Sequence, residues 1–237
     1  MPEGPEIRRA ADKIARVLEG RQIVDIHFGL DRLKGRERDF QGAEVREIET
    51  RGKALLTHFD NELTIYSHNQ LYGRWYVVKR DAFPETNRSL RLALHTRTHS
   101  ALLYSASDIS IWDQFELELH PFLAKIGPDI LSPKLTWKEI SQRLRSERFH
   151  RRTLASLYLA QDFLAGIGNY LRSEILFDAK VLPDARPLDL SVKQLNDLGR
   201  STLKISQRAY QTGGITNPPR RVARLKKQGL KRGAFRH

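Results

Sequence analysis

The first six residues of this chain, Met1-Pro2-Glu3-Gly4-Pro5-Glu6, would bring a secondary amine next to a carboxylate. The initiator methionine is normally removed when the next residue is small, which would free the ring nitrogen of Pro2. Unprotonated, that nitrogen is a nucleophile that condenses with a sugar carbon to an iminium ion, and Glu3 can deliver or accept protons. These residues therefore favour covalent amine catalysis. The alternative is structural, because proline in the first turn and nearby acids are also a good helix start.

A second motif with two glycines, Ala165-Gly166-Ile167-Gly168-Asn169-Tyr170, lies between two helical segments. The glycines relieve steric limits on the backbone, and Asn169 then stands where a helix begins. Its side chain and the neighbouring amides could meet a phosphate oxygen, which predicts a clamp on a DNA backbone. The alternative is that Gly166 and Gly168 only turn the chain while Asn169 caps the next helix.

The overall charge indicates a partner that carries phosphate. The chain has 41 Lys and Arg against 28 Asp and Glu, a formal charge of +13 and an isoelectric point of about 10.1. No apolar run approaches the roughly 18 residues of a membrane-spanning helix, and the amino end lacks a signal-peptide core. The absence of cysteine excludes disulfides and thiolate metal sites. We therefore expect a cytoplasmic protein at the nucleoid, without a membrane partner and without an obligate oligomer, hence a monomer.

The elements that must position these residues follow from the hydrophobic spacing. The length of 237 residues allows one large or two modest domains. Apolar residues spaced by three and four from Ile7 to Leu18, with Gly20 after them, predict an amphipathic helix that holds the amino terminus. Short alternating runs then predict the strands of a sandwich or barrel, at residues 23–28, 54–59, 63–66, 90–94 and 102–104.

Past Gly127-Pro128 the period becomes helical. Thr136 and Glu139 form a capping box, and further helical runs lie near residues 153–160, 169–179 and 191–210. After Pro219 the chain carries eight basic residues and no acid, which indicates a solvated segment or an arm that binds nucleic acid. These eight are Arg220, Arg221, Arg224, Lys226, Lys227, Lys231, Arg232 and Arg236.

Four motifs in order resemble the formamidopyrimidine-DNA glycosylase family: residues 2–6, 50–56, 67–73 and 165–170. The resemblance spans about residues 1–180, and it is closest to the branch that chiefly removes oxidised pyrimidines. It implies a DNA-repair enzyme that excises oxidised bases and nicks the abasic strand of duplex DNA by β,δ-elimination. It also implies an α+β multidomain fold: an amino-terminal helix with an antiparallel β-sandwich (1–126), a helix-two-turn-helix domain (127–214) and a basic tail (215–237).

The resemblance also assigns roles to single residues, with all family motifs read in the numbering of this chain. Pro2 attacks C1′ of the damaged nucleoside, Glu3 moves protons at the sugar, and Lys53 assists. Glu6 and Glu174 occupy positions of supporting family acids, and Asp129 also fits the pattern. Three neighbours, Gln70-Leu71-Tyr72, form the wedge that fills the gap left by the extruded lesion, since an apolar and aromatic insertion offsets lost stacking. Asn169, with Gly168, binds phosphate.

The chain departs from the family pattern at two places. Ala160 stands where the family usually has an aspartate, and Asp162 is expected to point elsewhere. Relatives end in a four-cysteine zinc hairpin that carries a DNA-entering arginine, whereas this chain has no cysteine ligand, so no metal and no other cofactor is expected. Two alternatives stay open: a protein that binds damaged DNA without turnover, because that module is missing, and a general basic nucleic-acid protein such as an RNA chaperone.

Overall fold

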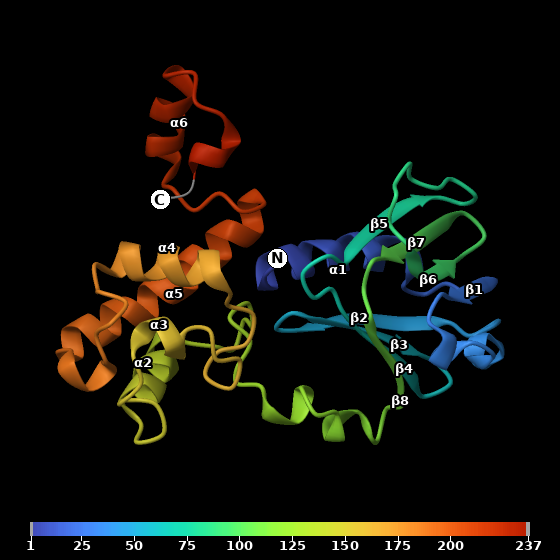
Figure 1. Cartoon of the computed structure of the whole chain (residues 1–237), viewed down its shortest axis with the longest axis horizontal. Helices are drawn as coiled ribbons and strands as arrows, with labels where there is room; N and C mark the ends of the chain where they lie inside the picture. The colour runs from blue at the N-terminus through green and yellow to red at the C-terminus, as the bar shows by residue number, and fades with distance from the viewer. Residues whose placement is uncertain (1, 236–237) are drawn as a thin grey trace. The chain divides into compact units, whose positions relative to one another are not determined.

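The computed structural model describes residues 2–235, which form two compact units (Figure 1). The sandwich unit holds residue 2 and residues 7–124, and the helical unit holds residues 3–6 and 125–235. Helix α1 (Gly4–Leu18) belongs to both units: residues 4–6 are part of the helical unit, and residues 7–18 are part of the sandwich unit. The initiator methionine and Arg236 of the basic tail lie outside the described residues.

The sandwich unit consists of two four-stranded sheets in which every pairing is antiparallel. The order of one sheet is β1-β6-β7-β5 and that of the other is β2-β3-β4-β8. The strands are β1 (Asp25–Phe28), β2 (Val45–Arg51), β3 (Ala54–Phe59), β4 (Leu63–His68), β5 (Arg74–Lys79), β6 (Leu90–His95), β7 (His99–Tyr104) and β8 (Asp108–Asp113). The predicted helix with an antiparallel β-sandwich is confirmed.

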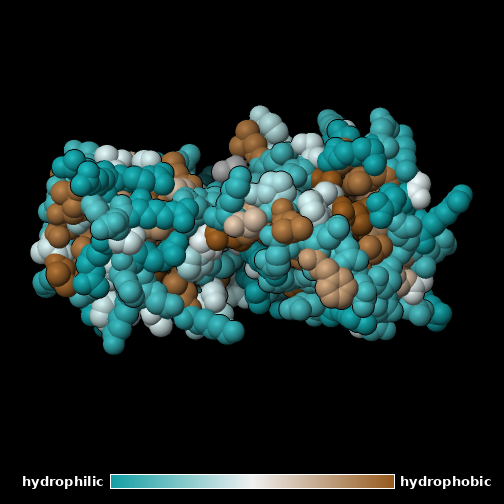
Figure 2. Space-filling view, turned by 90° about the horizontal axis from the view of Figure 1, so that it is seen from below, coloured by the Kyte–Doolittle hydropathy of each residue, from teal (hydrophilic) through white to brown (hydrophobic). Residues whose placement is uncertain are grey.

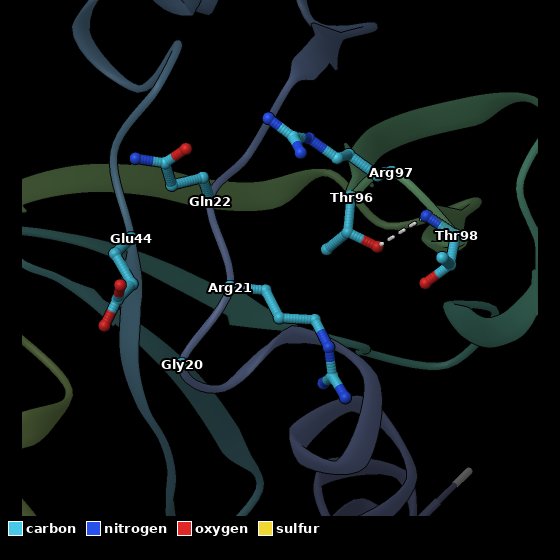
Figure 3. A pocket seen from close by; sticks show the side chains of 7 residues that line it. All are labelled: Gly20, Arg21, Gln22, Glu44, Thr96, Arg97 and Thr98. Atoms are coloured by element: carbon cyan, nitrogen blue, oxygen red, sulfur yellow. Dashed lines mark hydrogen bonds between the residues drawn. The ribbon is translucent and has the colours of Figure 1, made fainter.

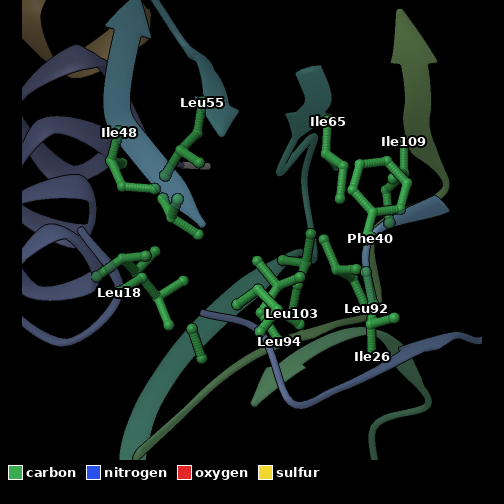
Figure 4. Close-up of a cluster of buried hydrophobic side chains, with 14 of the residues drawn as sticks. Leu18, Ile26, Phe40, Ile48, Leu55, Ile65, Leu92, Leu94, Leu103 and Ile109 are labelled. Carbon is green, nitrogen blue, oxygen red and sulfur yellow. The ribbon is translucent and has the colours of Figure 1, made fainter. Parts of the chain in front are cut away.

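One hydrophobic core fills the space between the sheets, and Figure 4 shows side chains of both sheets meeting in it. Leu55 and Ile65 come from one sheet and Leu94 and Leu103 from the other, while Leu18 comes from α1. All five are essentially without solvent exposure. Burying a side chain of this size contributes roughly 1.5–3 kcal/mol, so this cluster is what holds the sheets and α1 together.

Three strands were not predicted, namely β2, β5 and β8. Each of them is an edge strand of its sheet. Edge strands face solvent along one side and carry charged residues, as β2 does with its sequence VREIETR. In β2 these charges interrupt the alternation of apolar and polar residues from which the other strands were predicted.

The predicted helices of the helical unit are present, and one of them is shorter than predicted. Its helices are α2 (Trp137–Arg145), α3 (Leu154–Leu157), α4 (Asn169–Ala179), α5 (Val192–Thr212) and α6 (Pro219–Lys227). The capping box is confirmed: Thr136 Oγ1 accepts from the Glu139 amide at 3.2 Å, and the Thr136 amide donates to the Glu139 carboxylate at 2.7 Å. The predicted helix 153–160 is only one turn long, because the chain tightens after Leu157 toward the glycine loop.

The surface of the described part is mostly hydrophilic, and on the face in Figure 2 the apolar side chains form small separate groups. Among residues 2–235, no helix combines the length and the apolar character needed to cross a bilayer.

Close packing of α5 on α2 gives a stability test at Gly199, where an added Cβ would stand 2.6 Å from the Trp137 carbonyl oxygen. Alanine favours a helix over glycine by about 1 kcal/mol, but here the methyl group pushes the helices apart. We expect Gly199→Ala to lower the free energy of unfolding by about 1–3 kcal/mol, measured by urea denaturation. Gly233→Ala is the control, because its Cβ meets nothing within 4 Å. Equal stabilities of the two variants would contradict the packing described here.

Candidate active site

The carboxylate of Glu3 is buried and bound by the start of α4. Its Oε2 accepts from the Gly168 amide at 2.7 Å and the Leu171 amide at 3.2 Å, and its Oε1 accepts from the Tyr170 amide at 2.9 Å. Glu3 is only 2 % exposed. The first amides of a helix have no partner within the helix, and the helix dipole favours a negative charge there. Glu3 is therefore the anion that occupies the amino end of α4.

This arrangement explains both glycines of the loop. A Cβ at Gly168 would stand 2.4 Å from Glu3 Oε1, so the carboxylate fits only against glycine. Gly166 has φ of +102°, a conformation that L side chains rarely adopt, and its carbonyl accepts from the Gly4 amide at 2.8 Å. The chain after the amino terminus and the glycine loop thus lie backbone to backbone.

Glu6 holds the first peptide groups of the chain. Its Oε2 accepts from the Glu3 amide at 3.0 Å, which is the usual bond from the third helical residue to the residue that caps the helix. The Tyr170 hydroxyl donates to the same carboxylate, at 2.9 Å from Oε1. Tyr170 was not predicted as a site residue, although it follows Asn169 directly in the motif. Through Glu6 it fixes the peptide that carries Pro2, which is half-buried.

Asn169 begins α4 as predicted, with Gly168 at the capping position, and it is exposed. The expectation that the neighbouring amides meet a phosphate oxygen is not met here, because the amides of Gly168, Tyr170 and Leu171 bind Glu3. The reason lies in the dipole of α4, which attracts whichever anion is closest, and the chain supplies its own. A phosphate contact through the Asn169 side chain stays a prediction.

Gln161 ties down the loop next to the position where the family aspartate is absent. Its amide nitrogen donates to the Ile167 carbonyl at 2.9 Å, and its Oε1 accepts from the Gly166 amide at 3.1 Å. Asp162 points elsewhere, as expected, and pairs with Arg148 at 2.8 Å. Gln161, which follows Ala160, therefore holds the glycine loop in place, and this contact was not predicted from the sequence.

The two remaining acids of the helical unit have structural partners. Glu174 lies in the second turn of α4, is 5 % exposed, and accepts a hydrogen bond from the Thr216 hydroxyl. Asp129 caps a turn through its Oδ1, which accepts from the Leu131 amide at 2.7 Å, and its backbone forms a parallel bridge with Ala165. Both residues thus support the segments that carry the glycine loop.

Lys53 lies in the two-residue turn between β2 and β3, where Gly52 has φ of +64°. A positive φ at the first turn position matches the twist of a tight hairpin. Lys53 is 8 % exposed. A catalytic role of Lys53 stays a prediction.

The segment Gln70-Leu71-Tyr72 forms an exposed turn between β4 and β5, with Leu71 54 % and Tyr72 67 % exposed. Buried Asn69 closes the turn, because its carbonyl accepts from the Gly73 amide at 2.7 Å and its side chain donates to the Gly73 carbonyl at 3.2 Å. Two large apolar side chains are thus held in solvent by a rigid base, a geometry suited to insertion into a base stack.

His68, which the sequence analysis did not single out, sets the start of this turn. Its Nδ1 accepts from the Gln70 amide at 3.0 Å, and its ring packs edge-on against Phe122. Burial lowers the pKa of His68 below its ordinary 6.5; the Asp108 carboxylate opposes this shift and the Lys53 ammonium adds to it. The neutral ring that the Gln70 bond requires is therefore the favoured form, and Lys53 lies within electrostatic range of the turn's base.

A polar hollow of about 400 Å³ lies on the sandwich unit and is not part of this chemistry. Figure 3 shows Arg21 and Arg97 on two sides of it and Glu44 nearby. Gly20 of its lining follows the carboxyl end of α1, whereas Pro2 and Glu3 precede the amino end of that helix.

A zinc site of the family type does not fit this chain, because its four thiolate ligands have no counterpart in a sequence without cysteine. Among residues 2–235, no group of three His, Asp or Glu side chains is placed to hold a metal ion either.

Comparison with known proteins agrees with the resemblance. The model of the formamidopyrimidine-DNA glycosylase N-terminal domain matches residues 1–108, and that of the formamidopyrimidine-DNA glycosylase H2TH domain matches residues 126–219. Endonuclease 8 of Salmonella arizonae is 49 % identical over 217 residues, which cover 92 % of this chain and 82 % of the relative. Endonuclease 8 of Pectobacterium atrosepticum is 48 % identical over 220 residues, covering 93 % and 84 %.

Solved structures show the same fold at low sequence identity. A complex of Lactococcus lactis Fpg with DNA that contains an abasic site superposes with a TM-score of 0.77 at 21 % identity, covering 90 % of this chain and 79 % of that one. A complex of the same Lactococcus lactis protein (Fpg, MutM) with N7-benzyl-Fapy-dG DNA also gives 0.77 at 21 % identity, covering 92 % and 82 %. The chain therefore belongs to the formamidopyrimidine-DNA glycosylase family, whose enzyme class is DNA glycosylase and abasic-site lyase.

Proposed function

We propose that this enzyme removes oxidised bases, mainly pyrimidines, from duplex DNA and cuts the abasic strand through a covalent intermediate on Pro2. The class of DNA-repair glycosylase and lyase comes from the family and from relatives named Endonuclease 8. The base preference and the residue roles are the finer part of the proposal. The single observation that carries it is the burial of Glu3 among three backbone donors, directly next to Pro2.

The reaction needs an amine, a proton carrier and no external oxidant. The Pro2 nitrogen attacks C1′, the bond from C1′ to the base breaks, and the base leaves with the bonding electrons and takes up a proton. Ring opening gives a cationic iminium, which acidifies the C2′ proton. Loss of that proton expels the 3′ phosphate, a second elimination expels the 5′ phosphate, and water releases the sugar fragment and restores Pro2. Each step moves protons that a carboxylate at the sugar can carry.

The environment of Glu3 supports this role. An ionised carboxylate is costly to bury unless it is hydrogen-bonded, and three amides here bind that form. Its place directly after Pro2 would let this carboxylate exchange protons with a sugar bound to that residue. Glu6 and Tyr170 keep the preceding peptide in place, which limits the positions that the Pro2 ring can adopt.

The sandwich unit contributes a cation and a wedge. Lys53 lowers the tendency of a nearby amine to take up a proton, because like charges disfavour protonation. Leu71 and Tyr72 stand exposed on a rigid turn, and extruding a nucleotide costs a few kcal/mol that their insertion offsets.

The covalent intermediate can be trapped. We expect borohydride to link the protein to an abasic duplex, with the adduct located on Pro2 by peptide mass spectrometry. In Pro2→Gly both trapping and single-turnover cleavage should fall by at least about 10³-fold, since removal of a catalytic nucleophile has effects of that order or larger. Retained binding without Pro2-dependent cleavage would instead favour a protein that recognises damage without turnover. An adduct on Lys53 would contradict the assigned nucleophile.

A second test moves the Glu3 carboxylate without changing its charge. In Gly168→Ala the new Cβ would meet Glu3 Oε1 at 2.4 Å, so the carboxylate must shift. We expect the single-turnover rate on an abasic duplex to fall by about 10²-fold, as for a misplacement near 1 Å, while binding changes little. Gly233→Ala serves as the control, since nothing lies near its Cβ. An unchanged rate in Gly168→Ala would show that the position of Glu3 is not critical.

The His68 bond makes the wedge sensitive to pH. Because burial lowers the pKa of His68 below 6.5, the bond from the Gln70 amide is complete above pH 6.5 and is lost as the pH falls through the folded-state pKa. We expect affinity for a lesion duplex to fall over that acidic range. His68→Phe keeps an aromatic ring but removes the hydrogen-bond acceptor. We expect this variant to lose about 1 kcal/mol, or roughly fivefold, in affinity, and its affinity should no longer fall over the acidic range. An unchanged acid profile in His68→Phe would contradict the mechanism.

A further inference from the structure

The segment after α5 is a folded element that the family comparison does not describe. The H2TH model ends at residue 219, where α6 begins. We call residues 215–235 the basic hairpin: α6 is followed by a turn and a short 3₁₀ helix at Arg232–Phe235. Its described part contains seven basic residues and no acid. Figure 1 shows α6 beyond the end of α5.

Internal contacts hold the basic hairpin in shape. Phe235 is 5 % exposed, and its carbonyl accepts from the Asn217 amide at 3.1 Å. The Arg232 guanidinium donates to the last carbonyls of α5, at 2.7 Å from Gly213 O and 3.0 Å from Thr212 O. Lys226 lies over the Phe235 ring. Two of the seven cations therefore serve the fold.

Three of the other five cations lie together on α6. At 100° per residue, Arg220, Arg224 and Lys227 fall within a 60° stripe of α6. Half-buried Val222 and Leu225 lie on the opposite side of the same helix. All three stripe residues are exposed, and none forms an ion pair with an acid of residues 2–235. Such a stripe extends about 10 Å along the helix axis, which matches roughly three phosphates of one strand.

The first residues of the basic hairpin, which we call its root, are bound to α4. The Thr216 hydroxyl donates to Glu174, which lies five residues after Asn169 at the start of α4. Five helical residues span about 7.5 Å, so the root lies close to the end of α4 that binds Glu3. The burial of Glu174, which the proposed reaction does not use, is explained by this attachment.

We propose that the stripe Arg220, Arg224 and Lys227 is a binding site for the phosphate backbone of the duplex, placed by the Thr216 to Glu174 bond. The inference rests on the proposed function for its choice of DNA as the partner. The stripe reads no sequence, because guanidinium and ammonium groups on phosphate carry none. It instead adds contacts that release counterions, and its contribution therefore declines with salt.

The test is the salt dependence of duplex binding by the full chain. In Arg220→Gln/Arg224→Gln/Lys227→Gln, we expect the slope of log K against log salt to fall in magnitude by about 2–3 and affinity near physiological salt to fall by roughly tenfold or more. The matched control is Lys134→Gln/Lys138→Gln/Lys193→Gln, which removes three exposed cations from other parts of the helical unit. Its slope should stay close to that of the unaltered chain.

Further readouts separate this inference from the proposed chemistry. The adduct that borohydride traps in the stripe variant should still lie on Pro2, because no stripe residue enters the reaction. An unchanged slope in the stripe variant overturns the inference, whatever the outcome of trapping on Pro2. The inference is also overturned if the stripe variant shows a reduced slope on single-stranded RNA and an unchanged slope on duplex DNA, since the partner would then be RNA. Loss of trapping in the unaltered chain, with the slope change intact, would overturn only the proposed chemistry.

Discussion

The bond set between the buried Glu3 carboxylate and the first amides of α4 is the constraint on which the rest of the site depends. A carboxylate at 2 % exposure has few other ways to be stabilised, because desolvation costs several kcal/mol without hydrogen bonds. The chain start must therefore meet the glycine loop, and the loop must leave room for the carboxylate. Gly168 provides that room, and Gly4 and Gly166 allow the backbones to join.

The same constraint explains why the contacts that support the Glu3 carboxylate are hydrogen bonds. Gln161 fixes the loop from one side, and Tyr170 fixes the amino-terminal peptide through Glu6. Neither contact adds much stability alone, since a typical net hydrogen bond contributes about 1 kcal/mol. Their effect is geometric: they reduce the freedom of two segments, residues 3–6 and the glycine loop, that would otherwise move independently.

The sequence predicted those parts of the structure that depend on residues close to one another along the chain. The α1 spacing, the Thr136 capping box and the start of α4 at Asn169 all followed from residues within one or two turns. The edge strand β2 did not, because solvent on one side lets charged residues replace the alternating pattern. Nor could the sequence reveal that the α4 amides bind Glu3, since Gly168 and Glu3 stand 165 residues apart. Tyr170 was missed for the same reason, because it donates to Glu6, 164 residues away. His68 and Gln161 bind partners within six residues, and no pattern of residue types marked those bonds.

Glu3 and Glu174 show how one helix can use two buried acids differently. Glu3 meets the amides at the amino end of α4, where the helix dipole favours an anion, and it directly follows Pro2 in the chain. Glu174 lies a turn further, where helix amides are already paired, so it needs a donor from elsewhere in the chain. Thr216 supplies that donor and thereby connects α4 to the segment that follows α5. A single helix thus binds one buried carboxylate at its amino end and connects another to the segment that follows α5, and both contacts satisfy a carboxylate that is kept out of water.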